Sequence, residues 1–326
     1  MTGKRHRERP EPLHSPQAFS GLYTRPAAPT GYPATVSHFQ LAPLLAAWQA
    51  YLAAGGAPDD RIEVETSADL GLSTLTVTLT STAVLYPTGE RLQWEVANIL
   101  IGSSHNQCFI LDGVGGLSGS AQYIAAFSPT TNALRSLMPT AGAPTMLYSG
   151  ISMHRIKGTE PWADSVAKAR AVAPLTGRVL DTTTGLGYTA ILAARTAAEV
   201  VTIELDPTGL EVARQNPWSH ELFDRPNIQR VIGDAFEVVA EQPAGAFDRV
   251  IHDPPYLSLA GELYSEEMYR RLYRALRPGG RLFHYIGDPH SASGARVTAG
   301  ALRRLDAVGF QRITRRPEAF GVVATK

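Results

Sequence analysis

An acidic residue, two prolines and a tyrosine follow a hydrophobic run in the stretch FDRVIHDPPYLS, residues 247–258. Proline has no backbone N–H and holds φ at about −65°, so Pro254 and Pro255 should take the chain rigidly out of a strand. Asp253 and the Pro254 carbonyl would then offer two acceptors to the two hydrogens of an NH₂ group. Tyr256 adds a flat face on which a planar group can stack. The four residues predict a site that grips an amine nitrogen.

Three other hydrophobic runs also end in a carboxylate, at Asp181, Glu204 and Asp234. Ligands of open parallel sheets bind beyond the carboxyl ends of the strands, so these acids and Asp253 are expected at one edge of a sheet. Gly185 belongs to the turn after the first of these runs. Such a glycine lets the backbone approach a bound nucleoside closely.

The residues from Gly185 to Ala190 match the dinucleotide fingerprint G-x-G-x-x-A, with an acid 17 residues beyond Gly187, at Glu204. This pattern serves either NAD or S-adenosylmethionine. A pyrophosphate is repelled by nearby carboxylates, whereas the sulfonium and ammonium groups of S-adenosylmethionine are attracted by them. Asp181 near the glycines and Asp234, placed to accept from an adenine amino group, therefore favour S-adenosylmethionine over a nicotinamide cofactor.

Strands and helices alternate from about residue 160, which predicts a doubly wound parallel sheet. The expected strands cover residues 177–183, 199–205, 228–234, 247–253, 281–288, 310–319 and 320–326. The expected helices cover residues 187–197, 207–215, 235–242, 265–276 and 294–309. The last two strands would pair with each other to close a seven-stranded sheet.

The motifs VLDTTTGLGYTA (179–190), VTIELDP (201–207), VIGDA (231–235) and VIHDPPY (250–256) resemble those of class I Rossmann-fold methyltransferases that use S-adenosylmethionine. With GISMHR, NPWS, GELYS and GRLFHY, the set is similar to a group of predicted methyltransferases common in archaea. The resemblance covers residues 160–326. It implies that Asp181, Gly185 and Gly187 contact the methionine part of the cofactor, that Glu204 contacts the ribose, and that Asp234 and Ala235 contact the adenine. Thr183 departs from the family, which usually has glycine at that position of the cofactor loop. The DPPY motif implies transfer to the nitrogen of adenine, cytosine or glutamine.

Residues 36–150 predict a smaller, mainly β domain with one helix over 37–54, and this domain would choose the acceptor. Its strands alternate apolar and polar residues, and YPTGE (86–90) predicts a turn between two of them. GVGGLSGS (113–120) has no lysine at P-loop spacing, so it predicts a flexible loop. Residues 1–35 are basic and Pro-rich, which predicts a disordered tail, with a nucleic-acid-binding tail as the alternative.

Composition limits the partners. Lysine plus arginine and aspartate plus glutamate both number 30, so no global basic field indicates a nucleic-acid binder. No apolar run is long enough for a membrane span, and the single cysteine, Cys108, allows no internal disulfide and is expected to be buried. These features predict a cytoplasmic protein and leave its oligomeric state open. No metal site is expected.

For most of the further candidate side chains the sequence favours a structural role over a role in the site. His252 and His284 are expected to pack inside the sheet, because a strand points His252 away from Asp253. Arg155 could pair with a cofactor carboxylate or a substrate phosphate, or hold a hinge with His154. Trp218 is expected in the core or a lid, and Tyr269 and Tyr273 on one helix face.

The sequence as a whole predicts an S-adenosylmethionine-dependent N-methyltransferase, with an exocyclic base amine in RNA as the preferred acceptor. A small molecule or a protein side chain is an alternative acceptor. A polyamine synthase-like aminopropyltransferase has a similar layout and is the competing enzyme class. A nucleic-acid-binding module without catalysis is the third class.

Overall fold

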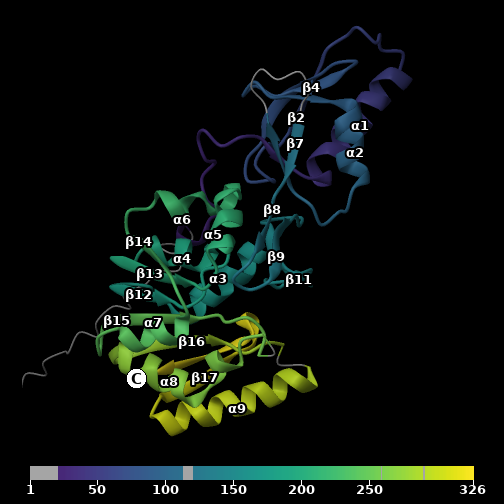
Figure 1. Cartoon of the computed structure of the whole chain (residues 1–326). Coiled ribbons are helices and arrows are strands. Elements are labelled where there is room, and N and C mark those ends of the chain that lie inside the picture. The colour runs from purple at the N-terminus through teal and green to yellow at the C-terminus, as the bar shows by residue number, and fades with distance from the viewer. Residues whose placement is uncertain (1–20, 113–119, 258, 289–290) are drawn as a thin grey trace, which may run out of the picture.

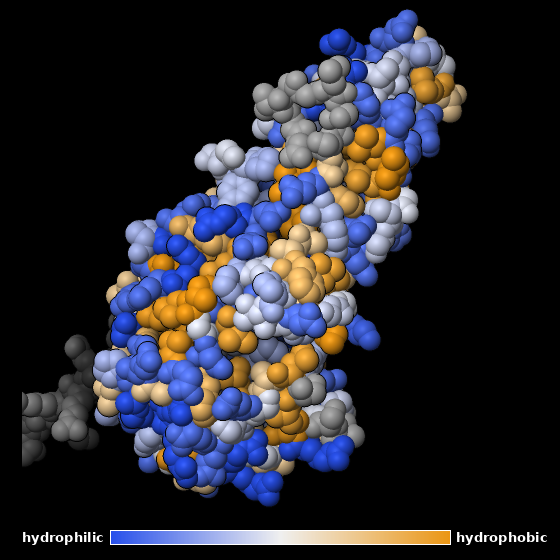
Figure 2. Space-filling model, viewed as in Figure 1, coloured by the Kyte–Doolittle hydropathy of each residue, from blue (hydrophilic) through white to orange (hydrophobic). Residues whose placement is uncertain are grey.

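The computed structural model describes residues 21–112, 120–257, 259–288 and 291–326. Figure 1 shows an elongated molecule in which an N-terminal unit projects from a larger α/β body. The space-filling view in Figure 2 shows the same division. Among the described residues no helix is both long and apolar enough for a membrane span.

The α/β body contains the predicted seven-stranded sheet, in the order β14-β13-β12-β15-β16-β18-β17. The first five of these strands run parallel, and β18 pairs antiparallel with both β16 and β17. The prediction that the last two strands pair to close the sheet is therefore confirmed, and the pairing is antiparallel. The bounds are β12 Arg178–Asp181, β13 Glu199–Glu204, β14 Ile228–Ile232, β15 Phe247–His252, β16 Leu276–Tyr285, β17 Gln311–Arg316 and β18 Gly321–Thr325.

Helices cover both faces of this sheet, as a doubly wound fold requires. One hydrophobic core lies under α3, α4 and α5, and a second lies under α7, α8 and α9. The sequence did not predict α3 or the short α6. The bounds are α3 Pro161–Val172, α4 Tyr188–Ala194, α5 Pro207–Arg214, α6 His220–Asp224, α7 Ala235–Glu241, α8 Glu266–Ala275 and α9 Ala292–Val308.

The N-terminal unit is mainly β, as predicted, with a third hydrophobic core of its own. Ser37 caps α1 in a reciprocal capping box with Gln40, which explains where the predicted helix begins. Two sheets, β1-β6-β7 and β2-β3-β4-β5, form the unit with α1 and α2. The bounds are β1 Thr35–Val36, α1 His38–Ala53, β2 Ile62–Thr66, β3 Leu75–Leu79, β4 Ala83–Leu85, β5 Arg91–Gln93, α2 Trp94–Gly102, β6 Phe109–Asp112 and β7 Ser120–Tyr123.

The prediction of one helix in this domain was wrong, because the strand after YPTGE ends at Gln93 and a second helix, α2, begins at Trp94. Trp94, Ala97 and Leu100 are buried at a spacing of three, which is the period of a helix face and not of a strand. The predicted turn at YPTGE is present between β4 and β5. The predicted loop at 113–120 lies, except for Ser120, outside the described residues.

A third sheet, β11-β10-β9-β8, joins the two parts. Its strands are β8 Ala125–Ser128, β9 Ala133–Met138, β10 Thr145–Tyr148 and β11 Ile151–Ser152. β8 and β9 pack on α5 of the α/β body, beside which Figure 1 shows them. The end of the predicted acceptor domain, residues 125–150, is therefore part of the surface around the sheet's carboxyl edge.

The segment from residue 21 to residue 35, predicted as the end of a disordered tail, packs against the α/β body. The Arg195 guanidinium donates to the Leu22 and Thr24 carbonyls at 3.0 and 2.6 Å. Arg25 lies over the Trp218 ring, 5.3 Å from its centroid. These contacts give a Pro-rich segment fixed partners that its composition does not reveal. Residues 1–20 lie outside the described part.

Candidate functional site

A cavity of about 200 Å³ opens beyond the carboxyl ends of β12, β13 and β15. This is the edge at which an open parallel sheet binds its ligand. The turn after β12, the ends of β13 and β15, the start of α7 and the β9–β10 sheet all contribute to its wall. Of the predicted site residues, the wall includes Thr183, Gly185, Glu204, Asp234, Ala235, Asp253, Pro254 and Pro255.

The Glu204 carboxylate is held on this wall by two backbone donors. Gly185 N–H donates to Oε2 at 2.9 Å, and Asp206 N–H donates to Oε1 at 3.1 Å. Burial raises the pKa of this carboxyl, while the two N–H donors oppose the rise. Gly185 has φ +53°, and a Cβ there would meet no atom within 4 Å, so its backbone faces open space. Each carboxylate oxygen keeps a lone pair for a ligand hydroxyl.

Asp234 and Ala235 lie at the third strand exit, where α7 begins. Asp234 is the N-cap of α7, and its Oδ1 accepts from Phe236 N–H at 2.8 Å. Asp234 is exposed and Ala235 is 6% exposed. The cap fixes the Asp234 rotamer, so its second oxygen has a defined position on the cavity wall.

Asp181 differs from the expectation, because it is absent from the described cavity wall. It is fully buried, and its Oδ2 accepts from the Thr202 hydroxyl at 2.9 Å and from the Thr189 hydroxyl at 3.3 Å. Burial raises the pKa of Asp181 to about 8, so the neutral acid dominates at pH 7. Asp181 therefore supports the turn from behind and supplies little negative charge.

Gly187 also lies outside that wall. Its φ is +76° at the N-cap of α4, and a Cβ would lie 2.6 Å from the Leu222 side chain. A glycine is needed here for the turn and for the close approach of Leu222. Its predicted contact with the cofactor stays a prediction.

The loop after β15 is fixed from both sides. The Thr183 hydroxyl donates to the Asp253 carbonyl at 2.7 Å, and the Tyr264 hydroxyl donates to the Pro255 carbonyl at 3.0 Å. Among the described residues no donor bonds the Pro254 carbonyl. The residue that departs from the family pattern, Thr183, thus ties the glycine turn to the DPPY loop. A glycine at this position has no hydroxyl and could not donate this hydrogen bond.

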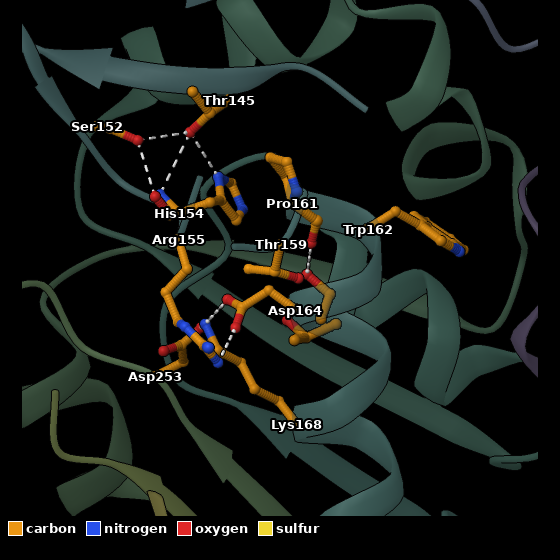
Figure 3. Close-up of polar contacts among 12 residues, drawn as sticks. Thr145, Ser152, His154, Arg155, Thr159, Pro161, Trp162, Asp164, Lys168 and Asp253 are labelled. Carbon is orange, nitrogen blue, oxygen red and sulfur yellow. Dashed lines mark hydrogen bonds and ion pairs between the residues drawn. The ribbon is translucent and has the colours of Figure 1, made fainter. Parts of the chain in front are cut away.

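A buried lysine, missed in the sequence, holds the predicted acceptor-gripping carboxylate. Lys168 Nζ lies 2.6 Å from Asp253 Oδ2 and 2.8 Å from Asp164 Oδ2. Figure 3 shows the three side chains converging, with Arg155 beside them. Burial alone would lower the pKa of Lys168, but the two carboxylates outweigh it and raise the pKa. Burial raises the pKa of Asp253, and Lys168 opposes that rise.

One signal in the sequence could have revealed Lys168. Asp164 and Lys168 are four residues apart in PWADSVAKARAV, whose Pro161 follows the N-cap Glu160. An acid and a base at this spacing lie on one helix face. The flanking alanines and valines indicate that this face is buried, where a lone lysine is rare.

The tyrosine of the DPPY motif lies on a smaller cavity beside the first. Tyr256 is 50% exposed and lines this second space with Tyr285, Met153, Lys168 and the DPP residues. His154 lines both cavities. Burial lowers the pKa of His154 to about 4, and Lys168 adds to the effect, so this ring is neutral at pH 7.

Most of the weaker candidates are structural. His252 is fully buried between the Thr182 hydroxyl, at 2.7 Å, and the Leu263 carbonyl, at 2.8 Å. His284 is bonded to the Tyr269 hydroxyl at 2.8 Å. Arg155 pairs with Asp164 at 3.0 Å and is not part of the larger cavity's described wall. Cys108 and Trp218 are completely buried, as expected.

The joining sheet contributes the opposite wall of the cavity through Thr131, Arg135, Met146 and Tyr148. Arg135 donates from Nε and Nη2 to Asp206 Oδ2 at 3.1 and 3.0 Å, which fastens the sheet next to Glu204. No group of three or more potential metal ligands occurs within the described ranges.

Comparison with known proteins agrees with this geometry. Residues 179–280 match the family model described as a methyltransferase domain. The polyamine aminopropyltransferase of Aeropyrum pernix is 37% identical over 28% of this chain and 30% of its own. The ribosomal protein uL3 glutamine methyltransferase of Bordetella pertussis is 32% identical over 35% of each chain.

A third relative is similar over a larger part of its length. The uncharacterized protein MJ1233 of Methanocaldococcus jannaschii is 49% identical over 199 residues, which are 60% of this chain and 68% of that one. That coverage extends well beyond the methyltransferase domain. The chain belongs to the family of MJ1233.

Proposed function

We propose that this protein is an S-adenosylmethionine-dependent N-methyltransferase whose acceptor nitrogen is held by Asp253 and Pro254. The observation that carries the proposal is the shared cavity wall. Glu204 ends β13 and Asp234 follows β14, on one side of β12, and the DPP residues follow β15, on the other side. A donor and an acceptor could therefore meet in one space.

The described residues fit the cofactor. Glu204 has carboxylate oxygens available to the two ribose hydroxyls, Asp234 has one for the adenine amino group, and the turn at Gly185 presents bare backbone. When bound, S-adenosylmethionine supplies an electrophilic methyl group on a positively charged sulfur. The acidic wall favours such a cation, and the match to a methyltransferase domain supports the assignment.

On the side of β15 the chain orients the acceptor and removes water. Asp253 Oδ1 and the Pro254 carbonyl are the two acceptors for an NH₂ group, and Thr183 and Tyr264 fix the loop that carries them. Holding the reactants in line can supply roughly 7–11 kcal/mol of the barrier reduction. Asp253 can take the proton released after transfer, directly or through water.

For the acceptor we propose an exocyclic amine of adenine or cytosine in RNA. Tyr256, half exposed beside the DPP residues, is placed to stack on a base that has left its helix. The charge of residues 36–150, with three arginines, no lysine and eight acids, does not favour a polyanion. A small-molecule amine is therefore the alternative acceptor.

The test uses S-adenosylmethionine labelled in the methyl group, with purified protein and either total RNA or a small-molecule extract. Label that enters RNA supports the RNA acceptor if the same N-methylated base is found in RNA from cells with the gene and is missing in RNA from cells without it. Label in the extract alone moves the acceptor to a small molecule. No label in any fraction contradicts methyl transfer.

A second candidate is aminopropyl transfer from decarboxylated S-adenosylmethionine. One observation favours it: the described wall of the larger cavity has no free cation for the methionine carboxylate. Arg135 is paired with Asp206, and His154 is neutral. The products discriminate, because methyl transfer leaves S-adenosylhomocysteine and aminopropyl transfer leaves methylthioadenosine.

A further inference from the structure

The buried charges behind Asp253 alternate in sign and leave no room for another positive charge. We propose that the acceptor enters as an uncharged amine, such as an aryl amine, a base amine or an amide, and that Lys168 sets this selectivity. The inference rests on the proposed function, because it concerns the same acceptor site. It adds a specificity residue and excludes alkylammonium acceptors.

Three ion pairs link four side chains into a row, in the order Arg155, Asp164, Lys168 and Asp253. The successive distances are 3.0, 2.8 and 2.6 Å. The Lys168 and Asp164 side chains are 2% and 0% exposed, whereas that of Asp253 is 19% exposed. Asp253 and Arg155, whose side chain is also 19% exposed, are therefore the members that a ligand can reach, and each positive charge in the row already has a carboxylate.

The smaller cavity around Asp253 offers a cation no other carboxylate. Its described wall contains Asp253 as the single acid, beside Lys168, Arg155 and the neutral His154. Tyr285 contributes its ring face, but Lys168 Nζ already lies 4.7 Å from that ring's centroid. An ammonium group arriving here would share Asp253 with Lys168.

The cost of sharing follows from the geometry. Oδ1 of Asp253 accepts no hydrogen bond from the described residues. An ammonium bonded to it would lie on the order of 5 Å from Nζ, where repulsion between like charges removes roughly 100-fold of the affinity that Asp253 alone would give. A neutral NH₂ group feels no such repulsion. It still gains both hydrogen bonds, since a carboxylate paired at Oδ2 can accept at Oδ1.

A matched pair of small amines tests the selectivity on the wild-type chain. Aniline is uncharged near pH 7.5, and cyclohexylamine, of the same size, is protonated. Ligand-observed NMR titrations with saturating S-adenosylhomocysteine should show aniline binding at least 10-fold more tightly than cyclohexylammonium. Equal binding, or tighter binding of cyclohexylammonium, would overturn the proposal.

Variants then assign the selectivity to Lys168. Lys168→Met should strengthen cyclohexylammonium binding at least 10-fold and change aniline binding by less than threefold. Because this variant leaves two buried carboxylates facing each other, the double variant Asp164→Asn with Lys168→Met, in which one of them becomes a neutral amide, provides a second and less destabilised test. Lys157→Met, at an exposed lysine, is the matched control. Unchanged selectivity in a folded Lys168 variant would refute the role of Lys168.

The same experiment separates this inference from the proposed function. If S-adenosylhomocysteine does not bind, the proposed function fails, and the amine pair is titrated against the protein alone. Tighter binding of aniline than of cyclohexylammonium to the protein alone would support the role of Lys168. Equal binding of the two amines would refute both the proposed function and the inference about Lys168. If the cofactor product binds and the amines show no selectivity, only the inference about Lys168 fails.

Discussion

Replacing Lys168 with methionine should destabilise the fold strongly, because it leaves the carboxylates of Asp164 and Asp253 facing each other. The lysine side chain is 2% exposed and reaches these partners at 2.8 and 2.6 Å, so a methionine there would leave both carboxylates without their cation. Breaking a buried ion pair by removing one partner costs about 3–5 kcal/mol. For a chain of this length that corresponds to a fall in Tm of roughly 10 °C.

The pH dependence of the loss distinguishes charge from packing. Burial raises the pKa of Asp253, and Lys168 is the group that opposes the rise, so the variant should raise this pKa further. A carboxyl whose folded pKa lies above its unfolded value contributes stability at low pH and loses it as the pH rises. The deficit of Lys168→Met relative to wild type should therefore shrink between about pH 7.5 and pH 5.

Thermal unfolding followed by circular dichroism at the two pH values measures the effect, with Lys157→Met as the exposed control, expected within about 0.5 kcal/mol of wild type. A Lys168→Met protein as stable as wild type near pH 7.5, or one with a deficit independent of pH, would refute the reasoning.

Other substitutions test separate parts of the site. Asp253→Ala should lower turnover about 100-fold through lost orientation while the cofactor Kd, measured by calorimetry, changes less than threefold; full activity would contradict its role. Glu204→Gln should raise the cofactor Kd roughly 10–100-fold, the worth of hydrogen bonds to a charged group, and an unchanged Kd would remove it from the ribose site. Gly187→Ala should lower Tm more than Gly185→Ala, because both have positive φ but only the first places a Cβ, 2.6 Å from Leu222, in a filled space. Equal Tm values would show that the α4 turn relaxes freely.

The architecture of the α/β body could be predicted from the sequence because its signals are local. The central strands β12, β13 and β15 contain short apolar runs that end in or next to an acid, and the closing pair of β17 and β18 was expected from the family pattern. The helix α2 was missed because Leu92, Trp94 and Val96 alternate with polar residues as in a strand. Trp94, Ala97 and Leu100 are buried at the spacing of a helix face, but their burial depends on tertiary packing and cannot be read from the sequence.

The site was predictable as a set of wall residues, but its electrostatics was not. Asp181 ends a strand like Glu204 does, yet threonine hydroxyls surround it behind the wall and its carboxyl is mostly neutral. Lys168 lies 85 residues before Asp253, and no local pattern links them. Contacts between distant segments determine which acids carry charge, so spacing along the chain cannot reveal them.

Calorimetric titration of the purified protein with S-adenosylmethionine, its decarboxylated form and NAD tests the central claim most directly. The account predicts one S-adenosylmethionine bound per chain and no binding of NAD. Binding of the decarboxylated compound or of NAD in place of S-adenosylmethionine would contradict it.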